Sequence, residues 1–177
     1  FWLDWFEGLL DEAGDDLDII MTGDDLAGQD GPLFRPSLYR ELVRPRHRRL
    51  MEFIRDRTDA QIWYHTCGAC REFIGDLADI GVHILNPVQV GASGMEPREL
   101  KAEFGDRVVF WGGAIDAQHE LPFACPEEVK RRVAQNVGAL KPGGGYVFAC
   151  VHNIQGRVPP ENVVAMYDAA LEYGDYR

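Results

Sequence analysis

Short apolar runs alternate along the chain with longer stretches in which apolar residues recur every three or four positions. The short runs are typical of buried β-strands, and the periodic stretches are typical of amphipathic helices. Strands are predicted at residues 17–21, 61–66, 82–85, 108–111 and 146–151. Helices are predicted at residues 2–12, 36–57, 71–80, 97–104, 126–140 and 159–171. Pro45 must kink the second helix or divide it in two, because proline lacks the backbone N–H.

The alternation of strands with helices predicts an α/β fold in which helices cover a parallel sheet. Every predicted strand has polar side chains at or just after its C-terminal end: Asp24 and Asp25, His65 and Cys67, Asn86, Asp116, and His152. In open α/β sheets and in (β/α)8 barrels, chemistry takes place at this end of the strands. A Rossmann-type sheet would carry a glycine-rich phosphate turn after its first strand, but Gly23-Asp24-Asp25 is acidic and would repel phosphate. A barrel is therefore favoured.

A (β/α)8 barrel contains eight strands in about 250 residues, and only five strands are predicted here. We therefore expect the C-terminal part of a TIM barrel, with residues 1–177 forming a single barrel domain whose N-terminal part is missing. The chain begins at Phe1, already within an amphipathic helix, which agrees with this expectation.

Charge and composition narrow the class of partner. The chain has 18 Lys and Arg against 29 Asp and Glu, a net charge of -11, which argues against nucleic acid or an anionic membrane as a partner. The run 44–49, with four arginines and one histidine, is predicted to be a solvated helix face. No apolar run approaches the roughly 20 residues of a membrane span. The four cysteines lack regular spacing, which is typical of reduced thiols, so a cytoplasmic location is expected.

His65 and Cys67 are the first candidates for chemistry. Residues i and i+2 of a strand point to the same face, and nitrogen and sulfur ligands suit Zn²⁺. A catalytic zinc takes three protein ligands and keeps one open position, where a substrate thiol would become a nucleophile. Cys150 and His152, again spaced i and i+2, could supply the third ligand. Two alternatives stay open: a structural core pair, and a redox pair in which Cys67 is joined by Cys70.

The other polar residues after the strands are candidates for contacts at the barrel mouth. Asp24 and Asp25 could cap the following loop, or one of them could bind a substrate amine or orient a ligating histidine. Asp116 could belong to a substrate loop or cap a turn. Polar side chains that could line the mouth are Gln29, Asn86, Gln89, Asn153 and Gln155.

Four motifs give the chain a resemblance to a known family: Gly23-Asp24-Asp25-Leu26, His65-Thr66-Cys67-Gly68, Gly112-Gly113-Ala114-Ile115-Asp116 and Val158-Pro159-Pro160-Glu161-Asn162. Their order resembles the C-terminal half of the uroporphyrinogen decarboxylase superfamily, over nearly all of the chain. That superfamily is a single (β/α)8 barrel with two chemistries. One branch decarboxylates uroporphyrinogen III without a cofactor, and the other includes zinc-dependent methyltransferases that move a methyl group from a corrinoid to a thiol.

The motif His-x-Cys-Gly resembles the methyltransferase branch and implies that His65 and Cys67 bind zinc. That branch has a cysteine as its third ligand, but here the register places His152 at this position, with Cys150 two residues earlier. His152 also resembles a histidine of the decarboxylases. The resemblance makes Asp24, Asp116 and His152 the candidate catalytic residues, and the polar residues Gln29 and Asn86 are candidates for cofactor contacts.

The expected function is therefore a zinc-dependent methyltransferase that uses a corrinoid as methyl donor and a thiol as small-molecule acceptor. A corrinoid protein is a candidate partner. The first alternative is a cofactor-free decarboxylase of tetrapyrrole biosynthesis. The second alternative is a non-catalytic fragment that acts as an interaction module.

Overall fold

The computed structural model describes residues 1–176, which contain one parallel sheet of five strands. The strands are β1 (Ile19–Gly23), β2 (Gln61–His65), β3 (Ile84–Asn86), β4 (Val109–Gly113) and β5 (Tyr146–Ala149). Their order in the sheet is their order in the chain. A doubly wound sheet reverses its strand order part-way, whereas a barrel does not. The fold is therefore part of a (β/α)8 barrel, as predicted.

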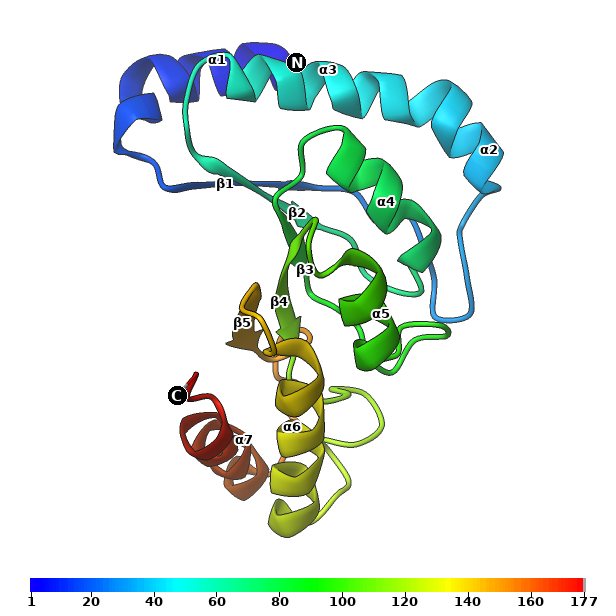
Figure 1. Ribbon diagram of the computed structural model, residues 1–177, viewed down its shortest axis with the longest axis vertical. Coiled ribbons are helices and arrows are strands. Elements are labelled where there is room, and N and C mark those ends of the chain that lie inside the picture. The colour runs from blue at the N-terminus through cyan, green and yellow to red at the C-terminus, as the bar shows by residue number, and fades with distance from the viewer. Residues whose placement is uncertain (177) are drawn as a thin grey trace.

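Helices follow the sheet from α1 and α3 at the top of Figure 1 to α6 and α7 at the bottom. The α-helices are α1 (Trp2–Ala13), α2 (Pro36–Leu38), α3 (Arg44–Arg55), α4 (Arg71–Asp79), α5 (Pro97–Phe104), α6 (Pro126–Leu140) and α7 (Pro160–Tyr173). A short 3-10 helix, η1, spans Gly14–Asp16, and a π-helical segment, η2, spans Tyr39–Val43. None of the helices within residues 1–176 is both long enough and apolar enough to cross a bilayer.

The predicted helix 36–57 is divided, as expected from Pro45. The chain passes through α2 and η2 before Pro45 takes its place in the first turn of α3. Proline is tolerated there because the N–H that it lacks has no partner in a first turn. The wider π-helical turn accommodates the missing hydrogen bond just before it.

Strand boundaries differ from the prediction by one or two residues. The predicted strand 17–21 is observed at Ile19–Gly23, and the predicted strand 82–85 is observed at Ile84–Asn86. The predicted strand 146–151 ends at Ala149, although Val151 is buried. An apolar run identifies buried chain, but a strand extends only as far as a neighbour pairs with it, and that pairing is a tertiary property.

Alternate residues of the strands lie on opposite faces of the sheet, and only one of these faces packs against the helices. Ile20, Ile62 and Phe110 are buried in the main core cluster between the sheet and its helices. Met21, which pairs with Trp63 in register, is on the opposite face and is 68% exposed. In a closed barrel this second face is the packed interior. A second core cluster, which includes residues of α6 and α7, closes the C-terminal end.

Candidate metal centre

Three side chains from the C-terminal ends of two strands converge on one point. His65 is the last residue of β2, Cys67 follows it by two positions, and His152 lies in the loop after β5. One ligand atom from each lies within 4.8 Å of the other two. Cys67 Sγ is 3.3 Å from His65 Nε2, and the two imidazole rings are 6.3 Å apart. The structure thus brings together the two predicted ligands and one of the two predicted third ligands.

Asn86 fixes the orientation of the His65 ring. Its Oδ1 lies 2.8 Å from His65 Nδ1, and its Nδ2 donates to the backbone carbonyl of Trp111 at 3.0 Å. Since the amide nitrogen is engaged with a carbonyl, Oδ1 must face the ring and accept the proton of Nδ1. The lone pair of His65 Nε2 then points toward Cys67, which is the neutral tautomer that binds a metal. Asn86, predicted as a cofactor contact, thus lies behind His65 and supports this predicted ligand.

Burial raises the pKa of the Cys67 thiol to about 11, and the nearby carboxylate of Asp25 adds to the effect. Asp25 also accepts a hydrogen bond from the backbone N–H of Cys67 at 2.8 Å. Without a cation the thiol stays protonated at neutral pH. A divalent metal would reverse the local charge and remove that proton.

Cys70 does not form a reactive pair with Cys67. Its side chain is fully buried at the N-cap of α4, and burial raises its pKa. Redox C-x-x-C motifs contain a thiol whose pKa is lowered, whereas here the pKa of both thiols is raised. The burial of Cys70 and the raised pKa of both thiols thus do not support the redox alternative.

His152, and not Cys150, completes the group. Cys150 packs against the second core cluster, where burial raises its pKa. Cys150 and His152 were predicted to lie on one face because the predicted strand extended to residue 151. The observed strand β5 ends at Ala149. Beyond that point the backbone turns, so the two side chains no longer share a face.

The donor set fits zinc. With zinc–sulfur bonds of about 2.3 Å and zinc–nitrogen bonds of about 2.0 Å, a tetrahedral site holds its ligand atoms roughly 3.3–3.6 Å apart. The Cys67–His65 distance of 3.3 Å already meets this condition. Any two ligand atoms that are as far apart as 4.8 Å would have to approach each other by about 1 Å to bind one zinc ion. His152 is exposed and can make that movement.

A cavity of about 280 Å³ lies beside this group. It is lined by Gln29, Cys67, Gln89, Asp116, Ala117, Gln118, Val151, His152, Asn153 and Gln155. We call it the amide pocket because five of these side chains are carboxamides. It contains Cys67 and His152, two of the four candidate metal ligands, together with residues predicted to line the mouth or a substrate loop: Gln29, Gln89, Asp116, Asn153 and Gln155. Gln118 was not predicted as a site residue. Its position two residues after Asp116 in the sequence could have indicated it.

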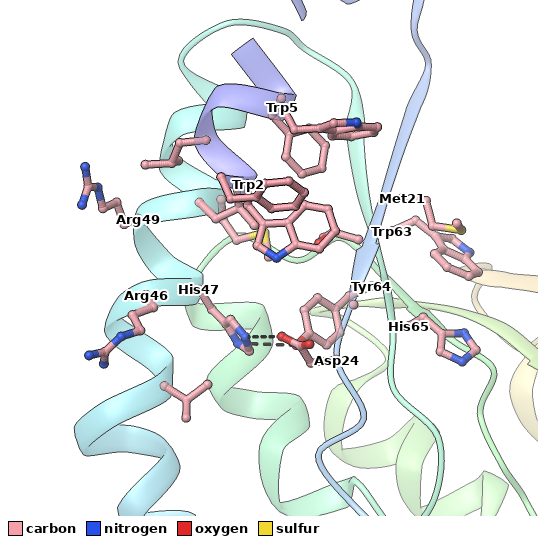
Figure 2. Close-up of a pocket in the computed structure, with 18 of the residues that line it drawn as sticks. Trp2, Trp5, Met21, Asp24, Arg46, His47, Arg49, Trp63, Tyr64 and His65 are labelled. Atoms are coloured by element: carbon pink, nitrogen blue, oxygen red, sulfur yellow. Dashed lines mark hydrogen bonds and ion pairs between the residues drawn. The ribbon is translucent and has the colours of Figure 1, made fainter. Parts of the chain in front are cut away.

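Asp24 lies in a different place. It faces a larger cavity of about 1040 Å³ that is lined by residues of α1, α3, β1 and β2. Figure 2 shows its carboxylate joined to His47, with Trp2 and Trp5 nearby and His65 set apart from the pair. The Asp24 Oδ2 to His47 Nε2 distance is 3.0 Å.

His47 was predicted to belong to a solvated helix face, and this prediction is wrong. The side chain is buried, and its Nδ1 lies 3.3 Å from the hydroxyl of Tyr39 and 3.4 Å from that of Tyr64. Burial is the largest cause that raises the pKa of both tyrosines, so both hydroxyls remain donors. In an amphipathic helix about one position in three or four faces the core. His47 occupies such a position, although its neighbours in the run 44–49 are mostly charged.

The model of the uroporphyrinogen decarboxylase family (URO-D) matches residues 14–173. The chain belongs to the uroporphyrinogen decarboxylase family. A uroporphyrinogen decarboxylase of Herminiimonas arsenicoxydans is 30% identical over 106 residues, which are 56% of this chain and 27% of that protein. A uroporphyrinogen decarboxylase of Alkalilimnicola ehrlichii is 37% identical over 71 residues, which are 40% of this chain and 19% of that protein.

A solved structure of a methyltransferase from Methanosarcina mazei shares the fold of this family member. The TM-score is 0.66 at 21% identity, and the match covers 89% of this chain and 43% of that one. The chain therefore spans less than half the length of the proteins that it matches. The superfamily resemblance drawn from the four motifs is confirmed, and so is the barrel fold.

Proposed function

We propose that this chain carries the metal centre of a zinc-dependent methyltransferase, which moves a methyl group from a corrinoid donor to a small thiol. The observation that supports this proposal is the convergence of His65, Cys67 and His152 beside a pocket. The proposed partners are the thiol and a corrinoid protein. A corrinoid would supply the methyl group and keep the electron pair of the carbon–cobalt bond, while the acceptor sulfur would gain the methyl group and release the thiol proton to solvent.

The residues have separate roles in this proposal. His65, held in one tautomer by Asn86, and Cys67 would form the rigid side of the zinc site, and His152 would close it. Bound zinc would supply a positive centre that lowers the pKa of the acceptor thiol. The amide pocket would hold the rest of the acceptor next to that centre.

The metal proposal is tested by zinc analysis of the intact protein after zinc loading and removal of excess metal. About one zinc per chain is expected, and His65→Ala and Cys67→Ser should each lose most of it. Cys125→Ser is the matched control, because Cys125 is an exposed thiol at the start of α6. A protein that retains no zinc, or variants that all retain it equally, would contradict the proposal.

A decarboxylase is the second candidate, because both curated relatives carry that name. The two functions differ in their products. Release of CO2 from uroporphyrinogen III by metal-free protein would support the decarboxylase. Zinc-dependent loss of the methyl group of methylcobalamin in the presence of a thiol would support the methyltransferase.

A further inference from the structure

The amide pocket has a wall of carboxamides organised around one buried side chain. Gln89, in the loop after β3, is only 7% exposed. Its Oε1 accepts a hydrogen bond from the backbone N–H of Gly68 at 2.8 Å. Its Nε2 donates to Gln29 Oε1 at 2.6 Å and lies 3.5 Å from Gln118 Oε1. Gln89 therefore ties the wall to the loop that carries Cys67.

This arrangement determines which atoms remain for a ligand. The carbonyl oxygens of Gln29 and Gln118 both turn toward Gln89, so the amide nitrogens of these two residues turn away from it. Within residues 1–176 neither of these nitrogens donates a hydrogen bond. The pocket thus offers amide donors to a hydrogen-bond acceptor on a bound molecule.

The charge of the pocket opposes an anion. Among the described lining residues there is no lysine or arginine, and the carboxylate is that of Asp116. Asp116 Oδ1 accepts from the backbone N–H groups of Gln118 and His119 at 2.7 and 3.1 Å, and Oδ2 lies 2.9 Å from His119 Nδ1. With the charge of zinc balanced by the thiolates of Cys67 and of the acceptor, an anionic group at the other end of the acceptor would meet the carboxylate of Asp116 without a countercharge, which is costly.

We propose that the amide pocket binds the acceptor through an uncharged carbonyl, amide or hydroxyl group, which Gln29 and Gln118 contact. Gln89 is the positioning residue that aims their amides. This inference rests on the proposed function for the identity of the bound molecule as the thiol acceptor. It adds the substrate class: a small neutral thiol rather than an acidic one, because a cavity of about 280 Å³ holds few atoms.

The test compares two thiols of the same size, 3-mercaptopropionamide and 3-mercaptopropionate, which differ in the charge of one end. Their dissociation constants are measured by titration calorimetry with the zinc-loaded intact protein. We expect the amide to bind about tenfold or more tightly than the carboxylate, because sites that hydrogen-bond a neutral group reject mismatched analogues strongly. Equal binding, or tighter binding of the carboxylate, would overturn the inference.

The variant Gln89→Met keeps the size of the side chain and removes its hydrogen bonds. It should lower the preference for the amide by about tenfold and also weaken zinc binding, because it releases the backbone of Gly68 beside Cys67. Gln135→Met, the same substitution on the exposed face of α6, should change neither. If Gln89→Met does not fold, Gln118→Met replaces it, since Gln118 is exposed. A preference that survives these pocket substitutions would also overturn the inference.

A metal-free experiment separates this inference from the proposed function. The methylthio forms of the same two ligands have no free thiol, and their binding is compared by ligand-observed NMR with protein stripped of metal. The pocket should still prefer the amide to the carboxylate. A protein that keeps this preference but binds no zinc would overturn the proposed function alone, whereas one that binds zinc and shows no preference would overturn the pocket inference alone.

Discussion

At the scale of single residues, the candidate metal centre depends on a supporting residue outside the motif that contains His65 and Cys67. His65 could rotate about its side-chain bonds, and Asn86 prevents this by accepting the proton of Nδ1. The two residues are 21 positions apart in the chain, but they face each other in the register of β2 and β3. The site therefore relies on the sheet for its geometry.

Asn86→Leu should weaken zinc binding by about 10- to 100-fold, as is typical when the partner of a ligating histidine is lost. The leucine cannot accept the Nδ1 proton, so His65 loses its fixed tautomer. Competition with a chromophoric chelator measures the change in affinity. Asn136→Leu is the control, because Asn136 lies on α6 and bonds the backbone of Ala114 instead. Unchanged affinity in Asn86→Leu would show that His65 does not need this support.

His47→Ala should destabilise the protein by about 1–3 kcal/mol, because the two buried hydroxyls that share its Nδ1 lose that partner. Tyr39 and Tyr64 are both buried against His47. Urea unfolding measures the loss. His119→Ala, at an exposed histidine, should stay within about 0.5 kcal/mol of the parent. If both variants were equally stable, the hydroxyls would have found other partners.

At the scale of elements, the loop after β2 packs against the loop after β1. Gly68 has a φ of +78°, and a Cβ at this position would overlap the carbonyl groups of Ala27 and Gly28. The N–H of Ala69 bonds the carbonyl of Gly28 at 2.8 Å. The glycine thus allows the backbone carrying Cys67 to approach its neighbour closely.

Gly68→Ala should cost at least about 2 kcal/mol, since it adds a steric overlap to an unfavourable backbone conformation. Zinc affinity should fall as well, because the backbone carrying Cys67 must move. Gly94→Ala is a matched control: Gly94 has a φ of +71° with open space around it. It should cost only the backbone strain of about 1 kcal/mol. Equal losses in the two variants would show that the overlap at Gly68 is relieved cheaply.

His83, between α4 and β3, links two strands by accepting the backbone N–H of Ile62 at Nδ1, at 2.9 Å. Burial lowers its pKa from 6.5, and the positive charge of Arg55 adds to the effect. A lowered histidine pKa means that the unfolded chain takes up the proton more readily. The contribution of His83 to stability is thus present above pH 6.5 and is lost as pH falls below it, toward the folded pKa.

His83→Asn should reduce this loss, because asparagine can accept the same N–H without titrating. Urea unfolding at several pH values between about 7 and 5 measures how the free energy of unfolding changes with pH. This slope equals the difference in bound protons between the unfolded and folded states, multiplied by a constant. The parent should lose more stability across this range than the variant. Parallel slopes would show that His83 does not contribute to the acid sensitivity.

At the scale of the whole molecule, one face of the sheet is only partly covered among residues 1–176. Ile19 and Met21 are 40% and 68% exposed, although they alternate with buried Ile20. β1 and β5 are the edges of the sheet, and each has one strand neighbour. Apolar faces and open edges of this kind favour association with other chains.

A protein consisting of residues 1–177 alone is expected to self-associate through this face and these edges. Size-exclusion chromatography with light scattering measures its mass at several concentrations. Met21→Lys should shift the distribution toward the monomer, because it places a charge on the apolar face of β1. A monodisperse monomer for the parent would contradict the expectation.

The sequence by itself determined the class of fold and the location of the chemistry. Helices and strands were identified because their periodicity is local, and polar residues at strand ends indicated the functional edge. His65 and Cys67 were predicted as a pair because residues i and i+2 of a strand lie on one face, although β2 ends at His65 and Cys67 lies in the loop that follows it. Each of these inferences uses residues that are close together in the chain.

Only the tertiary structure decided the rest of the site. The choice of His152 over Cys150 depends on where β5 ends, and that depends on its pairing with β4. The supporting role of Asn86, the buried position of His47 and the central place of Gln89 all arise from contacts between segments far apart in the chain. Such contacts follow from how strands pair and helices pack, which local patterns of hydrophobic and polar residues do not encode.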